Sequence, residues 1–413
     1  MISEDAVIIT PPIQAETQAV QWTARYGTRN YRPLPIAVYR ASGVRVWDTE
    51  GREYLDCVGC YSAVACGHLN AAVVGAARAQ LEKMAIVGRV VDTPELGVFL
   101  KRLCEYTQMD RACPMNSGAE AVETAIKIAR KWAYTVKGVP RGQAEILVAE
   151  GNFHGRTTTI AGLSSEARYR DDFGPSTPGF RVVPFGDHAS VAGAISERTA
   201  AVLMEPIQAE GGVVLPPPGF MAGLRRLCAE RNVLLIWDEV QTGFCRTGAR
   251  FAWQHEEARP DMVCLGKALG GGVYPVSAVA GRDEVMCVLE PGDHGSTFGG
   301  NPLAAVVGLA AMDEMDRLGL AERSARLGDL LRAGLTSIRL PIVKDVRGRG
   351  LLIGLEVNES VCAKRLNLAF LSEGILTKET RARTFRFAPP LTIEEDDVYE
   401  IVRRTGRALA AMS

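Results

Sequence analysis

Residues 233–243 read VLLIWDEVQTG, an unbroken apolar run that ends in two neighbouring carboxylates, Asp238 and Glu239. A short run that is apolar throughout is typical of a strand buried on both faces of a parallel sheet. In open α/β sheets, ligands bind at the carboxyl ends of such strands. A carboxylate that only caps a strand end is more common than one that binds a ligand. This segment alone therefore predicts a buried strand, and it makes the strand end only a candidate for a ligand site.

A second segment, DMVCLGKALGGG at residues 261–272, places Lys267 after another apolar run and just before a cluster of three glycines, Gly270 to Gly272. A lysine enclosed in this way loses solvation, which favours its neutral amine and makes it a nucleophile that can form an imine with a carbonyl. Pyridoxal phosphate (PLP) needs such a lysine, an acidic partner for its pyridine nitrogen, and a phosphate-binding loop. Lys267 and Asp238 fit the first two needs.

The loop before a long predicted helix fits the third need. Residues 117–120 read SGAE, a Ser-x-x-Glu capping box at the helix start. Its small residues let backbone N–H groups approach an anion, and the helix dipole favours negative charge there. A capping box without a ligand is the more common case, and the segment is neither a Walker A loop nor a strict GxGxxG. The three pieces together are more specific than any one.

The rest of the chain alternates short apolar runs with helical stretches, as in EILVAE, RVVPF, AAVLMEPIQ and FMAGLRRLCAERN. This alternation predicts an α/β fold with a mainly parallel central sheet covered by helices on both faces. Two strand-like segments follow residue 36, helices are expected over 71–85 and 94–107, and one long helical segment runs to about 335. We expect a smaller α+β domain from both chain ends: residues 1–60 and 301–413 around a large domain at 61–300.

Composition excludes several classes of protein. The 413 residues include 47 Lys+Arg and 48 Asp+Glu, a net charge of −1, and 47% are hydrophobic. This balance argues against a disordered chain and against a protein whose main work is binding nucleic acid. Only nine of the 47 basic residues are lysines, which makes one in a glycine-rich apolar setting conspicuous.

The N-terminus and the cysteines bear on the compartment. Glu4 and Asp5 precede a short apolar run broken by Pro11 and Pro12, unlike a signal or transit peptide, and no segment approaches the length of a spanning helix. The ten cysteines form no disulfide or zinc spacing beyond Cys57 and Cys60, so we expect buried thiols and no metal site. The expected protein is soluble and cytoplasmic.

Six motifs in this order, MNSGAEAVE, GNFHGRT, EPIQAEGG, WDEVQTG, GKALGGG and HGSTFGGNP, resemble the class III aminotransferases of PLP fold type I. The resemblance runs from about residue 30 to the end. Within the class, NYRPLPIAV, CYSAVACGH, ARKWAYTVKGV, GGVYPVSAV and RFAPPL look most like the ornithine aminotransferases.

The resemblance implies a role for each matching residue around the cofactor. Lys267 would be the Schiff-base lysine and proton shuttle, Asp238 the partner of the pyridine nitrogen, and Gln241 that of the ring hydroxyl. The remaining cofactor candidates are the stacking Phe153, the neighbouring Val240, and the phosphate loop Ser117, Gly118 and Ala119. Thr297 matches a residue that reaches the phosphate in the neighbouring subunit, which implies a homodimer or a higher homo-oligomer.

The resemblance also implies a substrate site. Arg156 would hold the α-carboxylate of ornithine in a pocket lined by Tyr31 and Tyr61, as suits the planar guanidinium fork. Glu210 and Arg386 would form a gate that frees Arg386 for the carboxylate of the second substrate.

Three positions depart from the family pattern. Residues 69–71 are atypical after the GH pair, and His154 stands where ornithine aminotransferases more often have tryptophan and acetylornithine enzymes have histidine. Packing is one reading of His154. Residues 85–93, AIVGRVVDT, replace a segment richer in Ser, Phe and Tyr near the substrate entrance, which leaves the amino donor open.

The expected reaction transfers the δ-amino group of L-ornithine to 2-oxoglutarate, giving glutamate and a semialdehyde that cyclises to pyrroline-5-carboxylate. Another ω-aminotransferase, using acetylornithine, lysine, a 4-aminobutyrate-like donor or a modified ornithine, is the alternative. An epimerase or decarboxylase on the same fold would show the same Asp238 and Lys267. A non-catalytic binding protein is disfavoured because Lys267, Asp238 and Arg156 are all retained. We expect no nucleic-acid or membrane partner.

Overall fold

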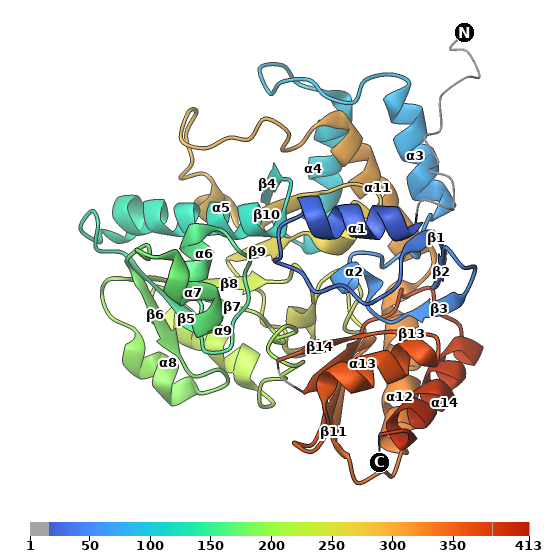
Figure 1. Ribbon diagram of the computed structural model, residues 1–413. Coiled ribbons are helices and arrows are strands. Elements are labelled where there is room, and N and C mark those ends of the chain that lie inside the picture. The colour runs from blue at the N-terminus through green and yellow to red at the C-terminus, as the bar shows by residue number, and fades with distance from the viewer. Residues whose placement is uncertain (1–15, 382, 413) are drawn as a thin grey trace.

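A computed structural model describes residues 16–381 and 383–412 of the chain (Figure 1). The acidic N-terminal stretch with Glu4, Asp5 and two prolines lies outside the described residues. Within the described ranges, no helix is long and apolar enough to cross a membrane.

The centre of the molecule is a seven-stranded sheet in the order β4-β10-β9-β8-β7-β5-β6. Only β10 runs antiparallel to its two neighbours, and the pairs from β9 to β6 are all parallel. The prediction of a mainly parallel central sheet is therefore confirmed. The strands are β4 (Arg111–Met115), β5 (Glu145–Ala149), β6 (Phe180–Val183), β7 (Thr199–Met204), β8 (Leu234–Asp238), β9 (Met262–Leu265) and β10 (Ser277–Gly281).

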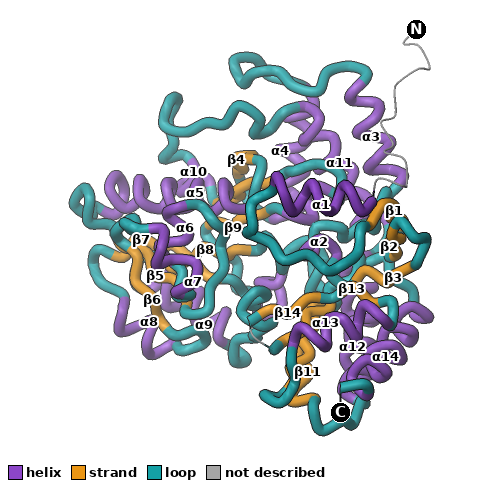
Figure 2. The backbone as a smooth tube through the Cα atoms, in the orientation of Figure 1, coloured by secondary structure: helices purple, strands orange, loops and turns teal. Residues whose placement is uncertain are grey.

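Helices cover both faces of this sheet, which explains its unbroken apolar runs. In β8, Leu235 and Trp237 belong to one core cluster, whereas Leu234 and Ile236 belong to another. The first cluster packs against α4, α9 and α11, and the second against α5, α6 and α10. Figure 1 shows α5 on one side of β5–β8 and α8 and α9 on the other, and Figure 2 shows the same layers as purple helices around orange strands.

The helices, with short π and 3₁₀ segments, are α1 (Glu16–Tyr26), α2 (Gly59–Ser62), α3 (Ala71–Leu81), α4 (Pro94–Thr107), α5 (Gly118–Trp132), η2 (Ala133–Lys137), α6 (Thr158–Leu163), α7 (Ala167–Arg170), η3 (Asp171–Phe173), α8 (His188–Ala194), α9 (Phe220–Glu230), η4 (Ala252–Glu256), η5 (Lys267–Gly270), α10 (Asp283–Met286), α11 (Pro302–Arg317), α12 (Leu320–Thr336), α13 (Ala363–Ser372) and α14 (Glu395–Ala410).

Two four-stranded sheets lie beside the central one, in the orders β1-β2-β3-β13 and β11-β12-β15-β14. The first joins the two ends of the chain, because β13 pairs in parallel with β3. Their strands are β1 (Val38–Ser42), β2 (Arg45–Asp48), β3 (Glu53–Asp56), β11 (Val343–Arg349), β12 (Leu352–Val357), β13 (Ile375–Leu376), β14 (Lys378–Thr380) and β15 (Thr384–Phe387).

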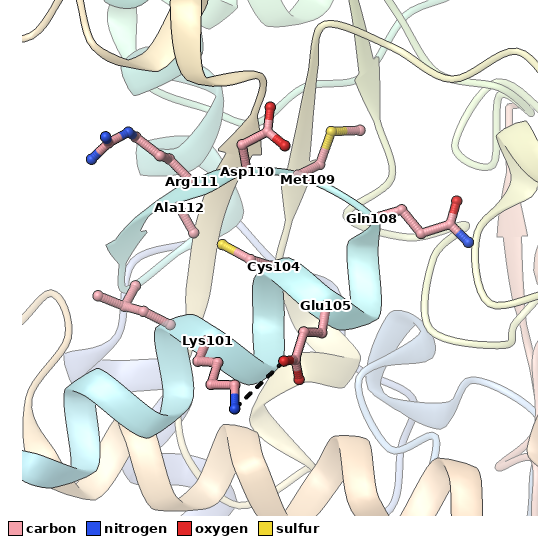
Figure 3. A pocket seen from close by; sticks show the side chains of 9 residues that line it. Lys101, Cys104, Glu105, Gln108, Met109, Asp110, Arg111 and Ala112 are labelled. Carbon is pink, nitrogen blue, oxygen red and sulfur yellow. Dashed lines mark ion pairs between the residues drawn. The ribbon is translucent and has the colours of Figure 1, made fainter.

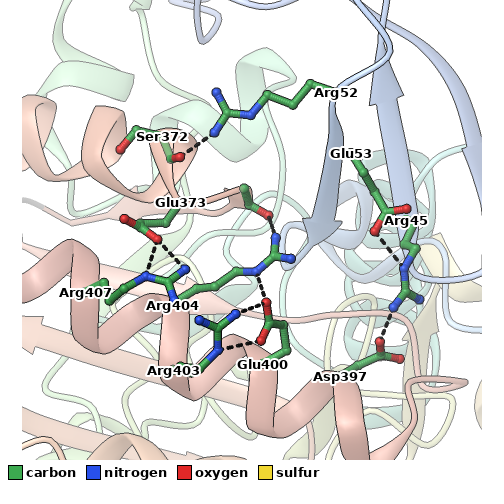
Figure 4. A network of polar contacts seen from close by, with 11 residues as sticks. Arg45, Arg52, Glu53, Ser372, Glu373, Asp397, Glu400, Arg403, Arg404 and Arg407 are labelled. Carbon is green, nitrogen blue, oxygen red and sulfur yellow. Dashed lines mark hydrogen bonds and ion pairs between the residues drawn. The ribbon is translucent and has the colours of Figure 1, made fainter.

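Ion pairs strengthen this junction between the chain ends (Figure 4). Arg45 on β2 reaches Glu53 at 3.0 Å and Asp397 on α14 at 2.6 Å. On the same helix, Arg407 pairs with Glu373 at the end of α13. The side chain of Asp397 is 9% exposed, so its pair with Arg45 is screened less than an open surface pair.

Two local expectations differ from the structure. The segment after residue 36 forms three strands, β1 to β3, because the Thr49–Gly51 turn adds a second hairpin to the one at Gly43. The helical segment that was expected to run to about 335 is two helices, because Gly319, with φ +58°, separates α11 from α12. The domain bounds 1–60, 61–300 and 301–413 stay a prediction.

Candidate active site

A cavity of about 180 Å³ lies at the carboxyl ends of the central strands. Every lining segment follows a strand, since Gly118 comes after β4, Phe153 after β5, Glu205 after β7 and Lys267 after β9. The lining residues are Gly118, Ala119, Phe153, His154, Gly155, Glu205, Ile207, Asp238, Val240, Gln241, Thr242 and Lys267. The strand ends that the sequence predicts as candidate sites therefore meet around this one cavity.

The two adjacent carboxylates at the end of β8, Asp238 and the following Glu239, face different surroundings. Asp238 faces the cavity, where Oδ1 accepts a hydrogen bond from Val240 N–H at 3.0 Å and Oδ2 lies 2.7 Å from His154 Nδ1. Glu239 is fully buried elsewhere and accepts from the backbone N–H groups of Ala252 and Trp253. Burial raises the pKa of Glu239 to about 7, against the opposing hydrogen bonds from those donors. Glu239 is thus a structural anchor.

Lys267 opens η5 directly after β9, in a left-handed conformation with φ +42°. Such a conformation is costly for a residue with a side chain and is found most often at functional sites. Among the described residues, its amino group makes no hydrogen bond or ion pair. Burial lowers the pKa of Lys267, an effect that Glu210 and Asp238 partly oppose. Burial therefore shifts Lys267 in the direction that the sequence predicts, toward the neutral amine.

The start of α5 forms a capping box beside this lysine. Ser117 Oγ accepts from Glu120 N–H at 3.2 Å, and Glu120 Oε2 accepts from Ser117 N–H at 2.7 Å. The first-turn N–H groups of Gly118 and Ala119 have no acceptor inside the helix and line the cavity. A Cβ on Gly118 would lie 2.7 Å from Val240 Cγ1, so only glycine lets the helix start approach β8 this closely.

The chemical groups of PLP can be compared with the residues that line or adjoin this cavity. The free N–H groups at the start of α5 suit its phosphate, and Asp238 suits its pyridine nitrogen. Gln241 Oε1 is buried without a hydrogen-bond partner among the described residues, and it suits a hydroxyl donor. The residues present fit the cofactor.

A second cluster adjoins the cavity through Gln241. Its Nε2 lies 3.5 Å from Glu210 Oε1, which in turn accepts from Arg386 Nη1 at 2.5 Å. Burial opposes the charge of the Glu210 carboxylate, but Arg386 and Lys267 outweigh burial and hold its pKa below the ordinary value. Arg386 is buried at 3% exposure and Glu210 is partly exposed at 27%, and Glu210 lies close enough to Lys267 to raise the pKa of its amine.

Tyr61 reaches this pair from an unusual turn. Gly59 to Ser62 all have positive φ, and a Cβ on Gly59 would lie 2.4 Å from the Ala388 carbonyl oxygen. The left-handed turn brings the Tyr61 ring to 5.7 Å from the guanidinium carbon of Arg386.

Other predicted residues lie away from the cavity lining. Arg156 lies over two aromatic rings, 3.9 Å from the Tyr169 centroid and 5.4 Å from the centroid of Phe153. Tyr31 is 70% exposed and Thr297 lies on an exposed loop, so neither lines the cavity within one chain.

The sequence missed several lining residues, chiefly Glu205 and His154. Glu205 lies in the motif EPIQ but carried no assigned role, and His154 was left open between packing and a bearing on substrate choice. Phe153 N–H donates to Glu205 Oε2 at 3.0 Å, and burial raises the pKa of Glu205 to about 8. A carboxylate that directly follows a buried strand was the signal available for Glu205. Gly155, Ile207 and Thr242 were also missed.

A larger hollow of about 590 Å³ lies between α4 and β4 (Figure 3). Two of its charged side chains, Lys101 and Glu105, pair with each other at 3.7 Å, and Arg111 pairs with Asp283 outside it. Its polar groups do not converge on one point, so we assign no chemistry to it.

All ten cysteines are free thiols, including Cys57 and Cys60. Within residues 16–381 and 383–412, no three His, Cys, Asp or Glu side chains are grouped to hold a metal ion.

Comparison with known proteins agrees with this geometry. The model of the family "Aminotransferase class-III" matches residues 26–409. The chain belongs to the class III aminotransferases. It is 47% identical over 393 residues to an ornithine aminotransferase of Brevibacillus brevis, covering 94% of this chain and 97% of that protein.

Solved structures of class III enzymes have the same fold. The crystal structure of the ornithine aminotransferase of Toxoplasma gondii superposes with a TM-score of 0.94 at 40% identity, over 96% of this chain and 95% of that one. The acetylornithine aminotransferase of Elizabethkingia anophelis gives a TM-score of 0.87 at 39% identity, over 96% and 99%. The predicted fold type I is confirmed, and as a class III aminotransferase the chain is a PLP-dependent enzyme.

Proposed function

We propose that this class III aminotransferase transfers the δ-amino group of L-ornithine to 2-oxoglutarate. The products are glutamate and glutamate 5-semialdehyde, which cyclises to pyrroline-5-carboxylate. The observation that carries the proposal is the closed Glu210–Arg386 pair beside Lys267, found in a chain whose curated relatives, at 46–48% identity, are named ornithine aminotransferases.

When bound, PLP supplies an electron sink for the carbon from which a proton is removed. Lys267 would hold the cofactor, and its amine would accept and return the proton that is removed from the substrate. Its depressed pKa supports this role, because an amine must be neutral to accept a proton. Asp238 would pair with the pyridine nitrogen, and Gln241 would bind the ring hydroxyl.

The other cofactor contacts complete the proposal. Phe153 would stack on the ring with Val240 beside it, and Ser117, Gly118 and Ala119 would hold the phosphate with N–H groups and a hydroxyl. These assignments are supported by the position of the residues, which line the cavity or, for Ser117, cap the helix beside it.

For the substrate, Arg156 binds the α-carboxylate of ornithine, with Tyr31 and Tyr61 lining the pocket. While Glu210 neutralises Arg386, the site presents no free cation to a second carboxylate, which favours a donor with a distal amine. Release of Arg386 then lets it bind the α-carboxylate of 2-oxoglutarate. The stacking of Arg156 on Tyr169 supports the first role by fixing the orientation of the guanidinium plane.

We also propose a homodimer in which Thr297 reaches the cofactor phosphate of the partner. Apolar side chains near Thr297 are exposed, with Val90 at 93% and Phe298 at 50%. The two segments are neighbours, since Leu303 N–H donates to the Ala85 carbonyl. Exposed apolar patches of this kind mark protein interfaces.

The ten free thiols support a reducing compartment, the cytoplasm.

The test uses the purified protein loaded with PLP and no oxo acid. L-Ornithine, N-acetylornithine and 4-aminobutyrate are added separately while the visible absorption of the cofactor is recorded. Conversion by L-ornithine, with glutamate formed once 2-oxoglutarate follows, is expected. Conversion by N-acetylornithine alone would assign the chain to the acetylornithine enzymes, which it resembles at 39% identity. No response to any amine would refute transamination.

A further inference from the structure

The loop between α10 and α11 is bound to one face of α5 by side chains that the proposed function leaves unused. Lys127 Nζ donates to His294 Nδ1 and to the Asp293 carbonyl oxygen, both at 3.0 Å. On the other side of the ring, His294 Nε2 lies 2.8 Å from Thr124 Oγ1. Lys131, one turn further along the helix, pairs with the Asp293 carboxylate. Because positions 124, 127 and 131 are three and four residues apart, the loop is docked along one stripe of α5.

The same loop is tied to the start of α5, where the phosphate of PLP is proposed to bind. Asn116 Nδ2 donates to Ser296 Oγ at 2.9 Å and to Glu120 Oε1 at 3.1 Å. Glu120 is the acidic member of the capping box at this helix start. Thr297 directly follows Ser296, so the residue proposed to reach the partner's cofactor is held by the helix that would bind the phosphate of its own subunit.

The donors and acceptors around His294 define its protonation state. The ammonium of Lys127 can only donate, so Nδ1 of the imidazole accepts and carries no proton. The Thr124 hydroxyl donates to the Glu120 carbonyl at 2.7 Å, which leaves its oxygen able to accept from Nε2–H of His294. The imidazole of the docked loop is therefore neutral, with its proton on Nε2.

The charged groups that face His294 disfavour a second proton. Lys127 contacts the ring from α5, Glu120 lies on the same helix, and the Asp293 carboxylate of the loop itself is engaged by Lys131. Burial, and after it the charge of Lys127, lower the pKa of His294 below its ordinary value of 6.5, and Glu120 only partly opposes them. The undocked loop therefore binds this proton more tightly than the docked loop. Docking is at full strength above pH 6.5 and weakens as the pH falls through the lowered pKa of His294.

We propose that neutral His294 is a positioning residue that docks the loop carrying Thr297 against α5, so that protonation of the ring weakens the retention of PLP. This proposal rests on the proposed function, since it needs the start of α5 to hold one phosphate and Thr297 to reach that of the partner. A protonated ring cannot accept from Lys127, and it places two cations 3.0 Å apart. The loop then leaves α5, and Thr297 leaves the second phosphate with it.

The size of the effect follows from the contact that protonation removes. The Nε2–H donor to Thr124 is kept by a charged ring, so only the hydrogen bond from Lys127 is lost. One hydrogen bond changes an equilibrium by about 5-fold. We expect the protection of the loop and the retention of PLP each to fall by about this factor between pH 8 and pH 5.5.

The experiment compares the PLP-loaded wild type with two variants at position 294. His294→Gln keeps one acceptor and one donor on a side chain that does not titrate, and His294→Leu keeps neither. Hydrogen exchange of residues 290–300, corrected for the intrinsic rate at each pH, reports the docking of the loop. The rate of PLP release after dilution is measured in parallel at pH 8 and pH 5.5. His188→Gln is the control, because His188 packs on Phe220 at α8.

The wild type should match His294→Gln at pH 8 and approach His294→Leu at pH 5.5, with exchange and PLP release about 5-fold faster. Lys127→Met tests the same contact from α5 and should release PLP faster already at pH 8. Wild-type loop protection that equals that of His294→Leu at pH 8, or that is unchanged at pH 5.5, would overturn the proposal. A loop that undocks while PLP release stays constant would overturn it as well. Failure of the wild-type protein to bind PLP would instead overturn the proposed function.

Discussion

The buried carboxyl of Glu205 makes the stability of the chain depend on pH in a way that can be measured. Its side chain accepts one hydrogen bond, from Phe153 N–H, and burial raises its pKa from 4.5 to about 8. The folded protein therefore binds this proton more tightly than the unfolded chain does. The stabilisation is present below pH 4.5 and is lost as the pH rises through 8.

The perturbation is Glu205→Gln, which keeps an oxygen that can accept from Phe153 and removes the titration. One pH unit between the two pKa values corresponds to about 1.4 kcal/mol. From pH 6 to pH 8 the Glu205 contribution therefore falls by about 2 kcal/mol, since the folded group begins to ionise near the upper limit. We expect the wild type to lose that much more free energy of unfolding than the variant over this interval.

The assay is urea unfolding of the cofactor-free protein at pH 6, 7 and 8, followed by tryptophan fluorescence at one protein concentration, because assembly shifts apparent stability. Glu230→Gln, on the exposed side of α9, is the control and should leave the wild-type slope unchanged. If wild type and Glu205→Gln lose stability in parallel between pH 6 and pH 8, the carboxyl is not held in its protonated form and the reasoning fails.

Three further variants test the site. Lys267→Ala should abolish turnover, and continued multiple turnovers would show that the lysine is misassigned. Gly118→Ala should weaken PLP binding about 10-fold or more, because the new methyl group would lie 2.7 Å from Val240 Cγ1. Adding Val240→Ala should restore binding, which a PLP titration of the wild type, the single variant and the double variant measures. If the second substitution restores nothing, the clash is not the cause. Glu210→Gln should lower the KM for 2-oxoglutarate and raise that for L-ornithine by freeing Arg386, and steady-state kinetics in which both constants stay unchanged would contradict the gate.

The central sheet could be predicted because its strands are buried on both faces and read as unbroken apolar runs. The segments ending at Ala149, Met204, Asp238 and Leu265 were all recognised in this way. The antiparallel strand β10 (Ser277–Gly281) was not singled out, since SAVAG is small and short and its pairing with β4 depends on residues over 160 positions away. The third N-terminal strand was missed because a tight turn divides one apolar pattern.

The position of the two proposed catalytic residues could be predicted because each follows an unbroken apolar run. Asp238 and Lys267 stand where apolar strands stop, and the structure places both on one cavity. The roles of Tyr31 and Thr297 stay predictions, since a single chain leaves both exposed. The contact between His154 and Asp238 joins positions 84 apart, and no local pattern encodes it.

The position of Glu205 next to Asp238 follows from the register of two strands, which the sequence alone does not give. Strands β7 and β8 are parallel neighbours with Met204 opposite Trp237, so the next residues, Glu205 and Asp238, lie side by side at the same edge of the sheet. Burial, and after it the nearby charge of Asp238, raise the pKa of Glu205. Asp238 receives two hydrogen bonds, one of them from a histidine, and Glu205 receives one. Glu205 therefore has fewer donors than its neighbour to offset burial, and its pKa of about 8 leaves it largely protonated near neutral pH.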